Sequence, residues 1–388
     1  MMDLTCIYLD NAATTRVSEE AAQLAYACMT KLYANPSSAH AFGFEAETAL
    51  KTARERVLTA LGVSPRDGNI VFTSCGTEAD NMAVFGAAAV GARKGKHIVI
   101  SDAEHPAVNN AAKELEKQGC TVSRVPTKGG RLDMDFAGKA ITPDTVLVSC
   151  MAVNNETGAM FDIASLCALT RKQAPHALFH TDAVQAFTKV PRLADSGADL
   201  ISLSGHKIHA PKGIGALYIK KGVRMPTRMF GGAQENGLRA GTEALPNIAA
   251  FGLAAQTAAA NININIAHYG ELKQRLTSFL TSHEGFAVNS GDEGFAPHIV
   301  SIAVPGIRSE ILLRALSAKG IYVSAGSACS SKHADNRVLS AFGLSDAIAD
   351  STVRVSFSAY TTNDEIDRLC EALVTERAAL LPTTSRRG

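Results

Sequence analysis

The chain has 388 residues, of which 46% are hydrophobic and 19% are charged, and its formal net charge is +1 at pH 7. A chain of this length is too long for a single hydrophobic core, so we predict one large domain and one smaller domain. The balanced charge gives no reason to expect direct binding to nucleic acid or to an anionic membrane. No stretch approaches the roughly 18 apolar residues that span a bilayer, and the first residues lack the features of a signal peptide, so we expect a cytoplasmic protein.

The first two thirds of the chain alternate between strand-like runs and helix-like stretches. The strand-like runs are short and rich in β-branched residues, and they occupy positions 69–73, 96–101, 120–125, 145–153, 176–182, 199–204 and 215–220. Helix-like sequence separates several of them, for example at 79–94 and 106–119. The alternation predicts an α/β fold with a mainly parallel seven-stranded sheet between helices, and functional residues at the carboxyl ends of its strands.

The pattern changes near residue 260. Positions 261–282 are typical of a linker that leads into a helix. The rest predicts a smaller α+β unit, with strands at 298–304, 321–327 and 352–360 and helices at 309–320 and 363–381. The last helix should begin at Thr362 or Asn363, because acidic residues follow in its first turn.

This change of pattern also predicts the domain boundaries. Residues 15–260 are expected to form the large domain. Residues 1–14 and 261–388 are expected to form the small domain, which carries Cys329.

The first candidate binding residues lie where the run at 69–73 leads into SCGTEADN and a helix. Backbone N–H groups at the helix start, together with Gly76 and the Thr77 hydroxyl, would suit a phosphate. The same pattern is common in α/β proteins. Glu78 and Asp80 in the first turn are equally explained as acids that complement the helix dipole.

Two further strand ends carry polar residues with open alternatives. His105 either begins a helix at Pro106 or stacks on a planar cofactor. Asp182 follows an apolar strand, where an acid needs a partner, so it either caps the next helix or holds a cationic ring nitrogen such as that of a pyridinium. Gln185, three residues later, could then hydrogen-bond the ring oxygen.

The segment SLSGHKIHAPKGIGALYI (202–219) places Lys207 in a polar turn after a strand. A lysine there is usually a solvated surface residue. However, Ser204 and His206 could bind an anion, and the glycines allow close backbone approach. This setting suits a lysine that forms a Schiff base with an aldehyde cofactor.

Cys329 lies in SAGSACSSK (324–332), a stretch of small residues. No pair among the eight cysteines forms CxxC, so neither a zinc site nor a thioredoxin-like motif is indicated, and we expect no metal. The stretch has no apolar run that would bury this thiol, so Cys329 is a candidate for a reactive cysteine. Lys332 and His333 are close enough in sequence to favour the thiolate.

Ten motifs in a fixed order give the chain a resemblance to a known family. They are YLDNAATT, NPSSAH, FTSCGTEADN, EHPAV, VNNETG, HTDAVQ, SGHKIHAPKGIGALY, LRAGTE, SAGSACSS and VRVSFS. Over about residues 5–375 the chain resembles a cysteine desulfurase of the pyridoxal 5′-phosphate-dependent, class V aminotransferase-like superfamily, in the bacterial branch that is associated with iron–sulfur clusters and nitrogenase. The resemblance implies a fold-type I enzyme that forms a homodimer.

The resemblance also implies a role for each matching residue. The catalytic residues would be Cys329, Lys207 and His105. The cofactor would be held by Lys207, Asp182, Gln185, Asn155, His105, Gly76, Thr77, Ser204 and His206, with Thr242 of the other subunit. Arg354 and Asn35 would receive the substrate carboxylate. An arginine in an otherwise uncharged strand suits such a clamp, although a surface arginine at a strand edge is the alternative.

The implied reaction converts L-cysteine to L-alanine and leaves the sulfur as a persulfide on Cys329. Lys207 would remove the α-proton, and the Cys329 thiolate would attack the substrate sulfur. The persulfide would pass to an acceptor protein, either a scaffold for iron–sulfur cluster assembly or another carrier. The alternatives are a selenocysteine lyase or another β-lyase on the same scaffold, and a non-catalytic sulfur carrier.

Overall fold

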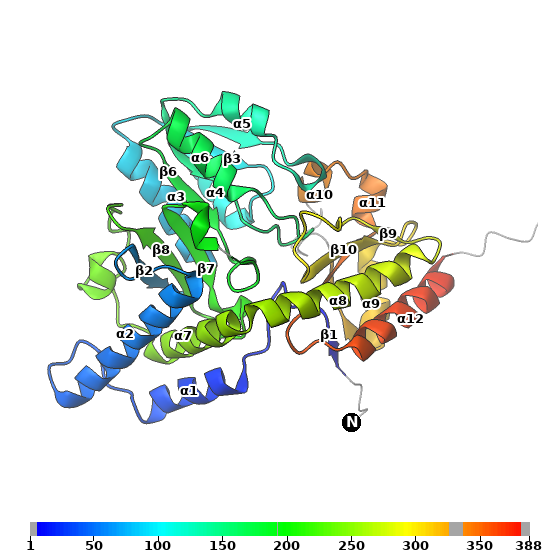
Figure 1. Ribbon diagram of the computed structural model, residues 1–388, viewed down its shortest axis with the longest axis horizontal. Helices are drawn as coiled ribbons and strands as arrows, with labels where there is room; N and C mark the ends of the chain where they lie inside the picture. The colour runs from blue at the N-terminus through cyan, green and yellow to red at the C-terminus, as the bar shows by residue number, and fades with distance from the viewer. Residues whose placement is uncertain (1–5, 192, 326–336, 382–388) are drawn as a thin grey trace, which may run out of the picture.

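A seven-stranded sheet lies at the centre of the computed structural model, which describes residues 6–191, 193–325 and 337–381 (Figure 1). Its strand order is β2-β8-β7-β6-β5-β3-β4. The strands are β2 (Gly68–Thr73), β3 (His97–Ser101), β4 (Thr121–Val125), β5 (Thr145–Ser149), β6 (Leu178–Asp182), β7 (Leu200–Ser204) and β8 (Gly215–Lys220). Strand β8 runs opposite to the other strands of this sheet, which all run in the same direction. The predicted α/β fold with a mainly parallel sheet is confirmed.

Helices cover both faces of this sheet. They are α1 (Glu19–Thr30), α2 (Ala41–Leu61), α3 (Gly76–Gly91), α4 (Pro106–Lys117), α5 (Met134–Ala140), α6 (Ile163–Gln173) and α7 (Leu245–Ala260). One face packs on α3 and α4, and the other packs on α2, α6 and α7. Strands between two helix layers lose water on both faces, which explains why every residue of β5 and β7 is buried.

A second, smaller core lies beside the large sheet. Its elements are β1 (Ile7–Tyr8), α8 (Ile262–Thr281), β9 (Ala287–Val288), β10 (Ile299–Ala303), α9 (Ser309–Ala318), β11 (Ile321–Tyr322), β12 (Ser324–Ala325), β13 (Thr352–Ser356) and α12 (Asn363–Leu380). Two short helices, α10 (Arg337–Ala341) and α11 (Asp346–Asp350), lie between β12 and β13 in the sequence, and Val338 of α10 packs in the core of the large sheet. Helices α8, α9 and α12 share a hydrophobic cluster with the sheet β12-β13-β10-β9 and with the pair β1-β11. The start of the chain and its last third therefore pack together, as the predicted domain division assumes, while the boundary residues themselves stay a prediction.

Over 261–282 the sequence predicted a linker that leads into a helix; the helix is confirmed as α8, but the linker before it is wrong. Helix α8 begins one residue after α7 ends, with only Asn261 between them, and the two helices follow one another from the large sheet to the second core (Figure 1). Asparagine and isoleucine favour helices only weakly. The buried side chains of Tyr269, Leu272 and Leu276 pack into the second core, and this packing outweighs the weak propensity.

Other boundaries differ less. Strand β5 ends at Ser149, before the predicted end at 153, so Cys150 lies after the strand instead of within it. Cys150 is nevertheless fully buried. The predicted strand at 321–327 is divided between β11 and β12, which pair with different strands. The last helix begins where expected, because Thr362 and Glu365 form a capping box. In the described ranges, no helix is both long and apolar enough to cross a membrane.

The close packing of α7 on α2 predicts a stability difference between two glycine substitutions. A Cβ at Gly252 would lie 2.7 Å from Ala53 Cα, whereas a Cβ at Gly270 in α8 meets nothing within 4 Å. We expect Gly252→Ala to lower the free energy of unfolding by about 1–3 kcal/mol, because the two helices must separate. The matched change Gly270→Ala should raise it by about 0.5–1 kcal/mol through its better helix propensity. Urea denaturation of both variants measures these changes, and equal effects would contradict the close packing.

Candidate active site

A cavity of about 430 Å³ lies at the carboxyl ends of the parallel strands. Its walls include the segments that follow β2, β3, β5, β6 and β7, together with β12 and β13 of the second core. The predicted site residues that line it are Gly76, Thr77, His105, Asn155, Asp182, Gln185, Ser204, His206, Lys207 and Arg354. Because parallel strands end at the same edge of a sheet, residues far apart in sequence converge there.

Three predicted site residues are not among those that line this cavity. Asn35 is exposed, and its side-chain oxygen accepts a hydrogen bond from the backbone N–H of Ser37. Thr242 is also exposed, and its predicted role concerns the cavity of a second subunit. Cys329 lies outside the described residues, but β12, which precedes it, lines the cavity. The roles of these three residues stay predictions.

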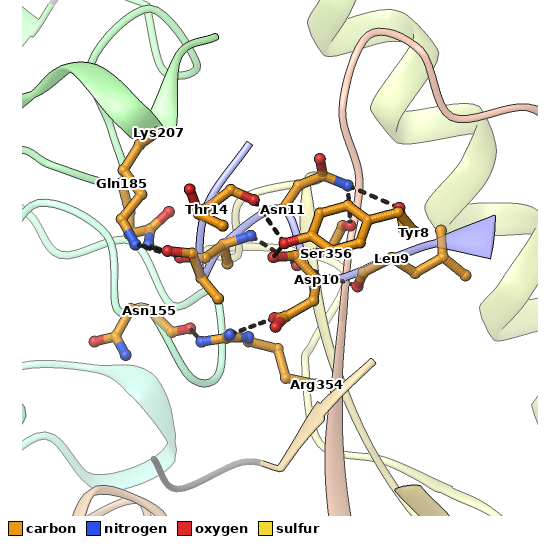
Figure 2. A network of polar contacts seen from close by, with 12 residues as sticks. Tyr8, Leu9, Asp10, Asn11, Thr14, Asn155, Gln185, Lys207, Arg354 and Ser356 are labelled. Carbon is orange, nitrogen blue, oxygen red and sulfur yellow. Dashed lines mark hydrogen bonds and ion pairs between the residues drawn. The ribbon is translucent and has the colours of Figure 1, made fainter. Parts of the chain in front are cut away.

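Lys207 lies in a single 3-10 turn, η3 (Gly205–Lys207), that follows β7. Its Nζ donates hydrogen bonds to the carbonyl oxygens of Ala12, at 2.6 Å, and Ala13, at 2.7 Å (Figure 2). Burial and the nearby Arg354 guanidinium lower the pKa of Lys207 to about 8. A buried lysine with this pKa offers a neutral amine near neutral pH, as a nucleophile or a general base requires.

Arg354 extends from β13 into the cavity and is only 6% exposed, so the surface alternative is wrong. Its guanidinium donates to the carbonyl oxygen of Asn155, at 2.8 Å, and to the carboxylate of Asp10, at 2.7 Å (Figure 2). Its Nε has no hydrogen-bond partner among the described residues. A fixed, buried guanidinium with an unused donor suits a ligand carboxylate.

Asp182 ends β6 and lies on the opposite wall. Its carboxylate accepts the backbone N–H of Val184 at 2.9 Å, and the following residues form turns, so the alternative in which Asp182 caps a helix is wrong. Burial raises the pKa of Asp182, and the nearby His105 and Lys207 oppose this effect. A cationic ligand atom would also lower the pKa of Asp182 and keep its carboxylate charged.

His105 begins helix α4, as one alternative predicted, while the stacking on a cofactor that the other alternative proposed stays a prediction. It is the N-cap of α4, where its Nδ1 accepts the N–H of Ala107 at 3.2 Å, and it also lines the cavity. Burial lowers the pKa of His105, which favours the neutral imidazole. A neutral ring in this place can contact a planar ligand without adding charge.

The first turn of α3 forms one end of the cavity. A Cβ at Gly76 would lie 2.9 Å from Val184 Cγ2, so only glycine fits there without a shift. The Cys75 side chain caps none of the N–H groups that begin this 16-residue helix. These N–H groups, with the Thr77 side chain, are a ready site for an anion.

Besides Arg354 Nε, three buried polar atoms of the cavity have no hydrogen-bond partner among the described residues. They are Asp80 Oδ1, Gln185 Oε1 and Ser204 Oγ. The other end of the Gln185 amide donates to the Ala12 carbonyl at 2.8 Å. Unpaired polar atoms in a buried cavity are costly, so a polar ligand that pairs with them would stabilise the site.

Sequence reasoning missed Asp80 and Asp10 as cavity or supporting residues. The sequence explains Asp80 by the helix dipole alone, but this residue is 1% exposed, and its Oδ1 lies 3.6 Å from His180 Nε2. Burial and the neighbouring Asp182 raise the pKa of Asp80. Asp10 belongs to the motif YLDNAATT, and that motif was the only sequence signal for its importance.

Comparisons with known proteins agree with this geometry. A family model described as aminotransferase class-V matches residues 7–369. The protein named cysteine desulfurase in Trichormus azollae is 41% identical over 374 residues, which are 95% of this chain and 92% of the relative. Cysteine desulfurase NifS of Azotobacter vinelandii is 40% identical over 94% of this chain and 90% of its own length. A solved structure described as a NifS-like protein covers 97% of this chain and 100% of its own, with a TM-score of 0.91 and 34% identity.

The lowered pKa of Lys207 predicts how its amine captures aldehydes. In protein freed of small molecules, the rate of covalent capture of pyridoxal should rise with pH, with its midpoint at about pH 8, and level off above that, since only the neutral amine attacks. The product is trapped by borohydride and located by peptide mass. Arg354→Gln removes a positive charge and should move this midpoint to higher pH. Asp10→Asn removes a negative charge and should move it to lower pH. A wild-type midpoint near 10, or shifts in the same direction, would contradict the assigned environment.

Proposed function

This chain belongs to the aminotransferase class-V family, and from this premise we propose that it is a cysteine desulfurase that converts L-cysteine to L-alanine and takes the sulfur onto Cys329. The observation that carries the proposal is one cavity in which a lysine of lowered pKa and a buried arginine face an acid and a helix N-terminus. Such a set can hold an amino acid by its carboxylate beside a reactive amine.

The cavity fits pyridoxal 5′-phosphate. The phosphate would be bound by the first turn of α3 and by the unpaired Ser204 hydroxyl, with His206, whose pKa burial lowers to about 4. Asp182 would pair with the ring nitrogen, His105 would lie against the ring, and Gln185 and Asn155 would lie near the ring oxygen. The bound cofactor would serve as the electron sink when the substrate loses its α-proton.

Lys207 would hold the cofactor and move the α-proton. Its pKa of about 8 allows the amine to accept a proton and to return it near neutral pH. The carbonyl oxygens of Ala12 and Ala13 fix Nζ in place and stabilise the ammonium form after the proton arrives. Proton transfer therefore needs no large movement of the lysine side chain.

Arg354 would receive the substrate carboxylate. Its contacts with Asp10 and Asn155 hold the guanidinium before the substrate binds, so little side-chain entropy is lost on binding. Asn35 is proposed as a second carboxylate contact, and Thr242 as a phosphate contact across a homodimer. Both residues are exposed in a single chain and so are available to such an assembly.

Cys329 is proposed as the nucleophile, because the segment that carries it leaves β12 at the cavity wall. Its thiolate would attack the substrate sulfur, the carbon–sulfur bond would break, and the substrate carbon would take up a proton to give alanine. The persulfide would then transfer its sulfur to an acceptor protein for iron–sulfur cluster assembly or another biosynthesis that requires sulfur. By the same resemblance we propose a cytoplasmic homodimer.

The decisive test replaces the proposed nucleophile. Cys329→Ser should lower alanine formation from L-cysteine by about 10³-fold or more and should remove the mass gain of one sulfur atom, while the visible absorbance of bound pyridoxal phosphate persists. The matched change Cys6→Ser, at an exposed thiol, should leave both products unchanged. Full alanine formation by Cys329→Ser would instead favour a lyase that needs no thiol nucleophile.

A further inference from the structure

A second cavity, of about 410 Å³, meets the candidate active site only at Lys207. Its walls come from the end of α7 and the start of α8, from the residues beside Lys189, and from the turn at 359–360. None of the proposed steps on cysteine uses this cavity. Several polar side chains in its largely apolar wall make it a candidate ligand site in its own right.

Lys189 is the buried charged residue of this second cavity. It is 7% exposed, and no hydrogen bond or ion pair involves its side chain within the described part of the chain. A buried ammonium without a partner is costly, unlike a solvated one. Because Lys189 lines the cavity, a negatively charged ligand in that space is the partner that would compensate it.

The charge around Lys189 is positive. Burial and the nearby Lys207 lower the pKa of Lys189 to about 7. Lys189 in turn contributes to the lowered pKa values of His206, His209 and His298, each of which is due first to burial. Within the described ranges, no acid offsets this charge at Lys189.

The remaining titratable groups of the cavity wall are Glu20, His209, Tyr269 and Tyr360. Glu20 is exposed and makes no ion pair with Lys189. Burial raises the pKa of Tyr269 to about 12, so its hydroxyl stays a neutral donor. The half-buried Asn265 adds an amide donor to the same wall. Donors and positive charge therefore line one cavity.

We propose that this second cavity binds a small oxyanion of the sulfate and phosphate class on Lys189, with Tyr269 and Asn265 as further donors. The volume accommodates such an ion with a few waters. The site is distinct from the phosphate site at α3, since the two cavities share only Lys207. An anion here would lie near Lys207 and favour its protonated form. The inference holds whether or not the proposed reaction is correct.

Equilibrium dialysis with radiolabelled sulfate tests the site. The protein is first saturated with pyridoxal phosphate, so that the α3 site is filled, and ionic strength is matched with chloride. We expect one saturable sulfate per chain in the wild type and about tenfold or weaker affinity in Lys189→Gln, because a charge-assisted contact is lost. The matched change Lys220→Gln, at an exposed lysine that ends β8, should bind as the wild type does. Absence of saturable binding, or undiminished binding by Lys189→Gln, overturns the proposal.

A pH series and a second variant make the test independent of the folding of Lys189→Gln. Sulfate keeps its charge near and above neutral pH, whereas Lys189 loses its proton as the pH rises through about 7. Because binding requires the ammonium form of Lys189, sulfate affinity should fall above about pH 7 and approach a loss of about tenfold per pH unit. Thr257→Glu, at an exposed position of α7 on the cavity wall, should abolish binding by placing a carboxylate near Lys189. Affinity that does not change with pH, or full binding by Thr257→Glu, overturns the proposal.

Discussion

The segment from Tyr8 to Thr15 holds the two sides of the candidate active site together. On the side of the large sheet, its carbonyl groups accept hydrogen bonds from Lys207 and Gln185 (Figure 2). On the side of the second core, the N–H of Ala12 donates to the hydroxyl of Ser356 on β13 at 2.8 Å. Because one short stretch of backbone bonds to both sides, the walls of the cavity keep a fixed spacing. The positions of the proposed base and the proposed carboxylate clamp both depend on it.

Burial sets the protonation of the site as strongly as its charge pairs do. Burial raises the pKa values of Asp80 and Asp182, and it raises the pKa of the fully buried Glu104 to about 7. The same effect lowers the pKa values of His105 and Lys207. Burial therefore favours the neutral forms of these five groups. A ligand with a phosphate, a ring cation and a carboxylate would supply charges that this environment can pair.

The parts of this structure that sequence predicts are those with a local cause. The seven strands follow from short apolar runs, and Asp182 was recognised because an acid directly after such a run needs a partner. The pair of Arg354 and Asp10 joins residues 344 positions apart, and no local pattern encodes it. Asp80 was misread because the acid-rich first turn of α3 is also explained by the helix dipole, while its burial follows from packing of α3 on the sheet. Asn261 does separate α7 from α8, but the break is one residue long, because packing of α8 in the second core outweighs the weak helix propensity of the residues that follow.

The junction of α7 and α8 also limits how the length of this chain can change. The two helices have 16 and 20 residues and are buried in different cores. Inserting one residue within α7 would rotate all that follows by about 100° and advance it by about 1.5 Å along the helix axis. The second core would then lose its register with the cavity, and β13 would carry Arg354 away from Lys207. Insertions and deletions among descendants of this gene should therefore accumulate in surface turns and be purged from this pair of helices.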